Sequence, residues 1–307
     1  MRNIKQNVTE LIGGTPLVRI NNIEKIENID AELLVKFEAV NPGGSAKDRP
    51  ALNMIAEAEK AGTIKPGGTI IEPTSGNTGV GLAMVAASKG YKAIMVMPET
   101  MSIERRKLLA AYGAEIVLTE GAKGMAGAVS KAEELNKANP NSIIAGQFVN
   151  PANSAAHFAS TGPEIWHDTE GKIDIFVAGI GTGGTITGVG AYLKKQNPEI
   201  KIVAVEPYDS PLLSQGKAGP HKLQGIGANF VPEVLDTDIY DEIITVTTDE
   251  AMGAMKALAQ NEGLFAGITS GAAVNAAIRL AKRPENKGKT IVAFLPDTGE
   301  RYLSVLE

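Results

Sequence analysis

The fold is decided by the segment Asp174-Ile175-Phe176-Val177-Ala178-Gly179-Ile180-Gly181-Thr182-Gly183-Gly184-Thr185. Its first half is a short apolar run, as expected of a strand buried on both faces of a parallel sheet. The glycines that follow let backbone N–H groups approach an anion, and the helical pattern of 184–196 places a helix N-terminus behind them. Thr182 and Thr185 add hydroxyl donors. The segment predicts a strand, a phosphate-binding turn and a helix.

Apolar runs and helical patterns alternate along the rest of the chain in the same order. The predicted strands are 69–72, 93–97, 115–118, 142–145, 173–178, 200–205, 242–246 and 290–295. The predicted helices are 79–88, 102–112, 123–139, 184–196, 249–261 and 271–282. This alternation indicates an α/β protein whose mostly parallel twisted sheets are flanked by helices. We expect a smaller domain at 41–149 and a larger one formed by 1–40 and 150–307.

Composition excludes several classes of function. The 307 residues carry a net charge of −5, 43% are hydrophobic, and none is cysteine. Disulfides, thiolate metal sites and cysteine nucleophiles are therefore absent, and the three histidines form no metal-binding spacing. The acidic balance argues against a nucleic-acid partner. The polar N-terminus and the lack of an apolar run of about 18 residues predict a cytoplasmic protein without metal or membrane contacts.

A second glycine turn, Thr74-Ser75-Gly76-Asn77-Thr78-Gly79, follows the predicted strand 69–72. Hydroxyls and backbone amides at a helix start suit a carboxylate, and the carboxamide of Asn77 can donate to a ring oxygen. A capping turn without a ligand is the alternative reading.

Lys47 lies in the string Asn41-Pro42-Gly43-Gly44-Ser45-Ala46-Lys47-Asp48-Arg49, just before a helical pattern. The helix dipole disfavours a cation at this position and lowers the pKa of the amine, which favours a nucleophile or a base. One amine and two anion-binding turns are what a cofactor with an aldehyde and a phosphate requires, with a substrate carboxylate in the second turn.

The glycine spacing also permits another reading. Gly179, Gly181 and Gly184 match the dinucleotide fingerprint, and Glu206 ends the next predicted strand. An NAD-binding protein is therefore the rival hypothesis, although it explains neither Lys47 nor the Asn77 turn.

The region 207–241 has little periodicity and several prolines and glycines. A long irregular stretch inside a compact domain is usually functional. We expect a lid or a subunit contact here, and a purely structural excursion is the alternative.

The chain resembles the cysteine synthases, or O-acetylserine sulfhydrylases, of the fold-type II pyridoxal-phosphate enzymes. The resemblance runs nearly end to end, and its motifs are 12–18, the Lys47 string, the Asn77 turn, 101–106, 147–153, the Gly181 turn, 222–227, 269–271 and 296–302. Ala46, Ser154 and Asn229 depart from the family's usual residues, and Asn229 could alter lid closure or substrate preference.

The resemblance implies a role for each motif residue. Lys47 forms the Schiff base with pyridoxal 5'-phosphate, and Asn77 contacts the ring hydroxyl. Ser270 hydrogen-bonds the pyridine nitrogen. The phosphate is held by Gly181, Thr182, Gly183, Gly184 and Thr185. The substrate carboxylate is bound by Thr74, Ser75, Thr78 and Gln147, the last from the opposite side of the cleft, while Gly225 closes over the site.

The implied reaction converts O-acetyl-L-serine and sulfide into L-cysteine and acetate through an aminoacrylate. The runner-up is a bacterial cystathionine β-synthase, which uses homocysteine as the acceptor, and a catalytically silent binding protein is an alternative of another class. A homodimer and binding of the C-terminal tail of serine acetyltransferase are also implied.

Overall fold

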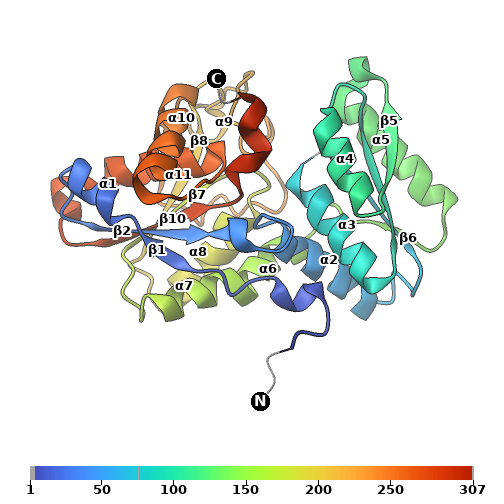
Figure 1. The fold of residues 1–307 in the computed structure, drawn as a ribbon, viewed down its shortest axis with the longest axis horizontal. Helices are drawn as coiled ribbons and strands as arrows, with labels where there is room; N and C mark the ends of the chain where they lie inside the picture. Colours follow the sequence, from blue (N-terminus) through green and yellow to red (C-terminus); the bar gives the residue numbers. More distant parts are fainter. Residues whose placement is uncertain (1–3, 75, 306–307) are drawn as a thin grey trace. The chain divides into compact units, whose positions relative to one another are not determined.

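The computed structural model describes residues 4–74 and 76–305, and they form two compact units (Figure 1). Unit 1 comprises the described residues up to Ile12 together with Asn41–Asn153, and unit 2 comprises Gly13–Val40 together with the described residues from Ser154 onward. The sequence-based boundaries, 41–149 against 1–40 with 150–307, differ from these at both ends of unit 1. Val8, Ile12 and Ala152 pack into the core of unit 1, which explains the difference.

Unit 1 contains a parallel four-stranded sheet with the order β5-β4-β3-β6. Its strands are β3 (Thr69–Pro73), β4 (Lys92–Pro98), β5 (Glu115–Thr119) and β6 (Ser142–Ile144). Its helices are α2 (Asp48–Lys60), α3 (Asn77–Lys89), α4 (Ile103–Ala111) and α5 (Gly124–Ala138). Ile70 and Met95 face the core formed with α2 and α3, while Ile71 and Val96 pack against α5. Both faces of the sheet are buried, as the continuous apolar runs predicted.

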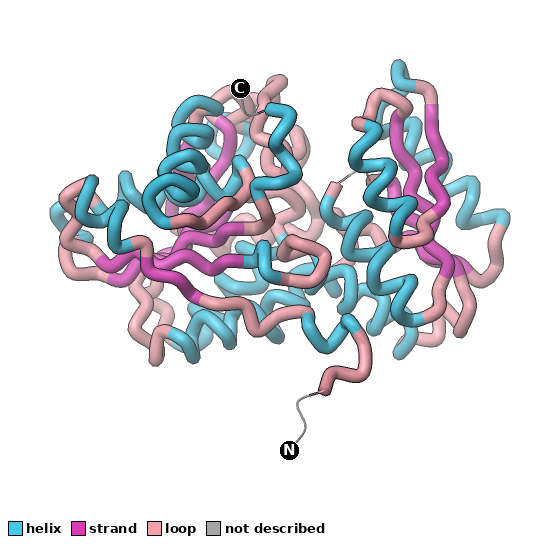
Figure 2. Tube along the Cα trace, in the orientation of Figure 1, coloured by secondary structure: helices cyan, strands magenta, loops and turns pink. Residues whose placement is uncertain are grey.

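Unit 2 is built on a six-stranded sheet with the order β1-β2-β10-β7-β8-β9. The strands are β1 (Leu17–Arg19), β2 (Glu32–Phe37), β7 (Ile175–Gly179), β8 (Lys201–Pro207), β9 (Glu242–Val246) and β10 (Thr290–Leu295). The helices are α1 (Asn21–Ile26), α7 (Gly162–Asp168), α8 (Gly184–Gln196), α9 (Leu212–Gln215), α10 (Thr248–Ala257) and α11 (Ile268–Ala281). α6 (Ala152–Ala156) contains the boundary between the units. Helices α10 and α11 cover one face of the sheet, and α7 and α8 cover the other (Figures 1 and 2).

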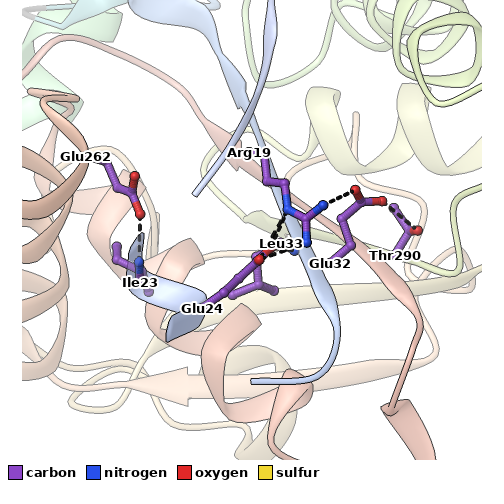
Figure 3. Close-up of polar contacts among 7 residues, drawn as sticks. All are labelled: Arg19, Ile23, Glu24, Glu32, Leu33, Glu262 and Thr290. Atoms are coloured by element: carbon purple, nitrogen blue, oxygen red, sulfur yellow. Dashed lines mark hydrogen bonds and ion pairs between the residues drawn. The ribbon is translucent and has the colours of Figure 1, made fainter. Parts of the chain in front are cut away.

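All eight predicted strands are present, but two short strands at the start of unit 2 were not predicted. β1 pairs with β2 and is antiparallel to it, unlike the other strand pairs of this sheet. Figure 3 shows how the edge is held: Arg19 on β1 contacts Glu24 and Glu32, and Glu24 accepts the backbone N–H of Leu33 over 2.7 Å. With three residues, β1 has no alternation long enough to predict it from sequence.

The region 207–241 is mostly irregular, with the short helix α9 inside it. This region packs into unit 2 through three buried side chains, Leu223, Ile226 and Leu235. The next helix, α10, begins with a reciprocal capping box between Thr247 and Glu250. No helix in the described residues is long and apolar enough to cross a membrane.

Candidate active site

Lys47 occupies the N-cap position of α2, at the end of a tightly closed turn. The N–H of Gly43 donates to the buried carboxylate of Asp48 over 2.6 Å, and the N–H of Gly44 donates to the carbonyl of Asn41 over 2.7 Å. A Cβ at Gly43 would collide with that carboxylate. The Asp48 carboxylate thus closes the turn that leads to Lys47.

The Asn77 turn follows the carboxyl end of β3, and Asn77 is the first residue of α3. Thr74 is buried, and its Oγ1 accepts the N–H of Gly76 over 3.1 Å. Ser75, a predicted carboxylate ligand, lies outside the described residues. Gly76 is the N-cap of α3 and makes no side-chain cap hydrogen bond, and a helix start of this kind suits an anion.

Gln147 lies in the same unit as the turn and contacts it directly. The Oγ1 of Thr78 donates to the Oε1 of Gln147 over 2.6 Å, and both side chains are buried. Asn153 donates from its Nδ2 to the Gln147 carbonyl over 2.7 Å. The expectation that Gln147 faces the turn from the opposite side was therefore wrong, because the chain after β6 returns Gln147 to the side of Thr78.

The predicted phosphate-binding turn joins β7 to α8. Gly183 is the N-cap of α8 with φ +83°, a conformation that favours glycine, and a Cβ there would lie 2.6 Å from the Cβ of Leu235. The N–H of Gly184 points to the Thr182 Oγ1 at 3.4 Å. The turn has the backbone N–H groups and helix start of an anion site.

A buried histidine contacts Thr185 at the end of this turn. His157 is buried, with its Nε2 3.3 Å from the Thr185 Oγ1 and its Nδ1 2.9 Å from the Thr161 Oγ1. It begins a π-helical turn, His157–Thr161, between α6 and α7. The imidazole orients the Thr185 hydroxyl. In the sequence, His157 is one of three histidines without metal-binding spacing, and no local pattern indicates its contact with Thr185.

Ser270 lies in the first turn of α11 and is fully buried. Its Oγ has no hydrogen-bond partner among the described residues. A buried hydroxyl without a partner loses free energy unless a ligand supplies one. Helix α11 packs against β7, the strand that leads to the Gly181 turn.

The segment 225–227 is tied to the same turn. The N–H of Gly227 donates to the Ile180 carbonyl over 2.9 Å, and His221 contacts the Gly227 carbonyl through Nε2 at 2.8 Å. A Cβ on Gly181 would collide with the carbonyl oxygen of Gly225. Gly225 itself has φ +109°, which side chains rarely adopt.

Known proteins resemble the chain over nearly its whole length. The model of the family described as "Pyridoxal-phosphate dependent enzyme" matches residues 8–297. The chain belongs to this family. A cysteine synthase of Staphylococcus aureus (strain Mu50) is 58% identical over 299 residues, which are 97% of this chain and 95% of that protein.

Solved structures of family members have the same fold. The cysteine synthase of Entamoeba histolytica matches with a TM-score of 0.95 and 46% identity, over 99% of this chain and 90% of that one. A hydrogen sulfide-producing enzyme of Fusobacterium nucleatum matches with a TM-score of 0.92 and 47% identity, over 98% of this chain and 100% of that one. An O-ureido-L-serine synthase matches with a TM-score of 0.94 and 44% identity, over 99% of this chain and 95% of that one. The predicted fold class is confirmed.

The residues present fit the family's cofactor, pyridoxal phosphate. The N-terminus of α8 offers N–H groups to a phosphate, and the partnerless Ser270 Oγ offers a hydroxyl to a neutral ring nitrogen. Three or more metal-ligating side chains gather nowhere in the described parts of the chain. The NAD reading fails because the family model covers both the Gly181 turn and Lys47.

Proposed function

We propose that the chain makes L-cysteine and acetate from O-acetyl-L-serine and sulfide, with pyridoxal 5'-phosphate as cofactor. The observation that carries the proposal is the 58% identity to a cysteine synthase over 97% of the chain. The alternative of a cystathionine β-synthase is not favoured, because the similar proteins carry the names of cysteine and O-ureido-L-serine synthases.

The residues divide the work between cofactor and substrate. Lys47 holds the cofactor through its amine and, once released, accepts the proton from the substrate α-carbon. Asn77 donates to the ring hydroxyl, and Ser270 hydrogen-bonds the ring nitrogen. The phosphate is bound by Gly181, Thr182, Gly183, Gly184 and Thr185. The substrate carboxylate is bound by Thr74, Ser75, Thr78 and Gln147, with Gly225 at the edge of the site.

The cofactor, when bound, withdraws electrons from the α-carbon and so assists loss of the acetate. A serine hydroxyl at position 270 cannot protonate the ring nitrogen as a carboxylic acid would, which limits this withdrawal and favours β-replacement. The Thr78–Gln147 pair orients the carboxamide so that the substrate carboxylate is held while the β-carbon reacts.

Product analysis tests the proposal. Purified protein loaded with cofactor should form cysteine from O-acetylserine and sulfide, and Lys47→Ala should form none. Cystathionine as the main product from O-acetylserine or serine with homocysteine would overturn it. A homodimer, a cytoplasmic location and binding of a serine acetyltransferase tail stay predictions, and titration with a peptide of that tail sequence would test the last.

A further inference from the structure

Glu72 is a buried carboxyl group beside the Asn77 turn that the proposed mechanism does not use. It lies on β3 and is 1% exposed. Its Oε2 accepts the N–H of Gly146 over 2.8 Å, and its Oε1 accepts the N–H of Gln147 over 3.3 Å. Two acceptor oxygens thus meet two backbone donors, and only an ionised carboxylate serves both fully.

The Gln147 side chain also acts on this carboxyl group and helps to hold its pKa down. The opposite end of the carboxamide is fixed, because its Oε1 accepts from the Thr78 Oγ1 over 2.6 Å. A negative charge at one end requires the amide nitrogen to face it, and this fixes which end of the carboxamide is the donor. The nitrogen carries two N–H groups, so one remains for a substrate oxygen while Glu72 receives the other.

We propose that Glu72 is a positioning residue for substrate binding: it holds the Gln147 backbone and carboxamide so that the amide nitrogen meets the substrate carboxylate. The inference rests on the proposed function, which places that carboxylate at Thr78 and Gln147. Gly146, with φ +70°, allows the sharp bend that brings both N–H groups to one carboxylate.

Burial raises the pKa of Glu72 to about 7, and the hydrogen bonds from Gly146 and Gln147 keep it from rising further. The charged residues of the elements packed on β3 are Lys89 on α3, Lys92 on β4, and Lys131, Glu133, Glu134 and Lys137 on α5. None of these is among the causes of the shift. Positioning by Glu72 should therefore weaken as the pH falls through 7.

The test measures binding of L-serine, a carboxylate ligand, to the cofactor-loaded protein through the change in cofactor absorbance. Glu72→Gln should raise the dissociation constant about tenfold at pH 8, the loss expected for one hydrogen bond to a charged group. Both constants should rise as the pH falls from 8 to 6, because the serine amine must lose a proton to react with the cofactor aldehyde, and that of the parent should rise more than that of the variant. The kcat for cysteine formation should change less than threefold.

Two further variants separate positioning from folding. Glu24→Gln alters another buried carboxylate that accepts a backbone N–H, in unit 2, and should leave serine binding unchanged. In a Gln147→Ala background, Glu72→Gln should raise the dissociation constant of serine by less than a further twofold, because the carboxamide that Glu72 positions is gone. Equal effects in both backgrounds, or the same pH dependence of serine binding in the parent and in Glu72→Gln, would overturn the inference. Failure of the proposed function would instead appear in the parent, as serine binding without cysteine formation.

Discussion

Thr78 and Gln147 are 69 positions apart in the chain, yet the Thr78 Oγ1 donates to the Gln147 Oε1 over 2.6 Å. Thr78 is in the first turn of α3, and Gln147 follows β6, the strand that pairs with β3 at the edge of the unit 1 sheet. The parallel pairing brings the carboxyl ends of both strands to one edge, and with them the two side chains.

This pair predicts how Gln147→Ala behaves. The variant loses a donor to the substrate carboxylate, which corresponds to about 1.5–3 kcal/mol, or roughly tenfold to a hundredfold in KM for O-acetylserine. Thr78→Val should raise KM less, because the backbone N–H of residue 78 remains for the carboxylate and the Gln147 carboxamide is misplaced but not removed. Steady-state kinetics measures both. Unchanged KM in the alanine variant would remove Gln147 from the carboxylate site, and cofactor absorbance before substrate addition is the control.

The sequence predicted the parallel sheets and both glycine turns, because each is a local signal of periodicity or turn chemistry. It could not predict Glu72 at the N–H groups of Gly146 and Gln147, since that contact depends on the register of β3 with β6. The contact of His157 with Thr185 could not be predicted either, because a π-helical turn that begins 28 positions earlier in the chain supplies the imidazole.

Ser270 should respond differently with and without cofactor. In the protein freed of cofactor, Ser270→Ala should leave the Tm unchanged or raise it, since it removes a buried hydroxyl without a partner in the described structure. In the loaded protein the lost hydrogen bond should weaken cofactor binding by about 0.5–1.5 kcal/mol. Ser270→Asp should be worse in both forms, because it buries a charge. Thermal melts of both forms measure this, and an equal Tm loss with and without cofactor would contradict the assigned role.

Gly183 allows backbone strain and crowding to be separated. Gly183→Ala places a Cβ 2.6 Å from Leu235, whereas Gly216→Ala, at φ +69°, meets no atom within 4 Å. The control should lose about 1–2 kcal/mol from the left-handed conformation alone and keep its cofactor. Gly183→Ala should lose more stability and some cofactor, and Gly183→Asp should retain the least, since its charge repels the phosphate. Cofactor absorbance after dialysis measures how much cofactor each variant retains. Full retention of cofactor by Gly183→Asp would show that the phosphate does not bind at this turn.

Lys47 should be the residue that carries the cofactor. Borohydride reduction followed by peptide mapping should find cofactor on Lys47, and Lys47→Ala should carry none. Lys36 is the internal control: it is fully buried, with its Nζ 2.9 Å from Glu164, so a cofactor cannot reach it. Label on any lysine other than Lys47 would contradict the assignment.

The raised pKa of Glu72 predicts that folding stability depends on pH. The pKa of Glu72 is about 7 in the folded chain against an ordinary value of 4.5, so between these values the folded state binds more protons than the unfolded state. The free energy of unfolding therefore falls as the pH rises from about 4.5 to 7, by at most about 3 kcal/mol at roughly 1.4 kcal/mol per pKa unit. Glu72→Gln removes the titration and should flatten this part of the curve, whereas Glu24→Gln should leave it in place. Urea unfolding of the cofactor-free proteins at pH 5, 6, 7 and 8 measures the difference between parent and variant. A parent that gains stability over this range, relative to Glu72→Gln, would mean that the two backbone N–H groups outweigh burial and that Glu72 stays ionised throughout.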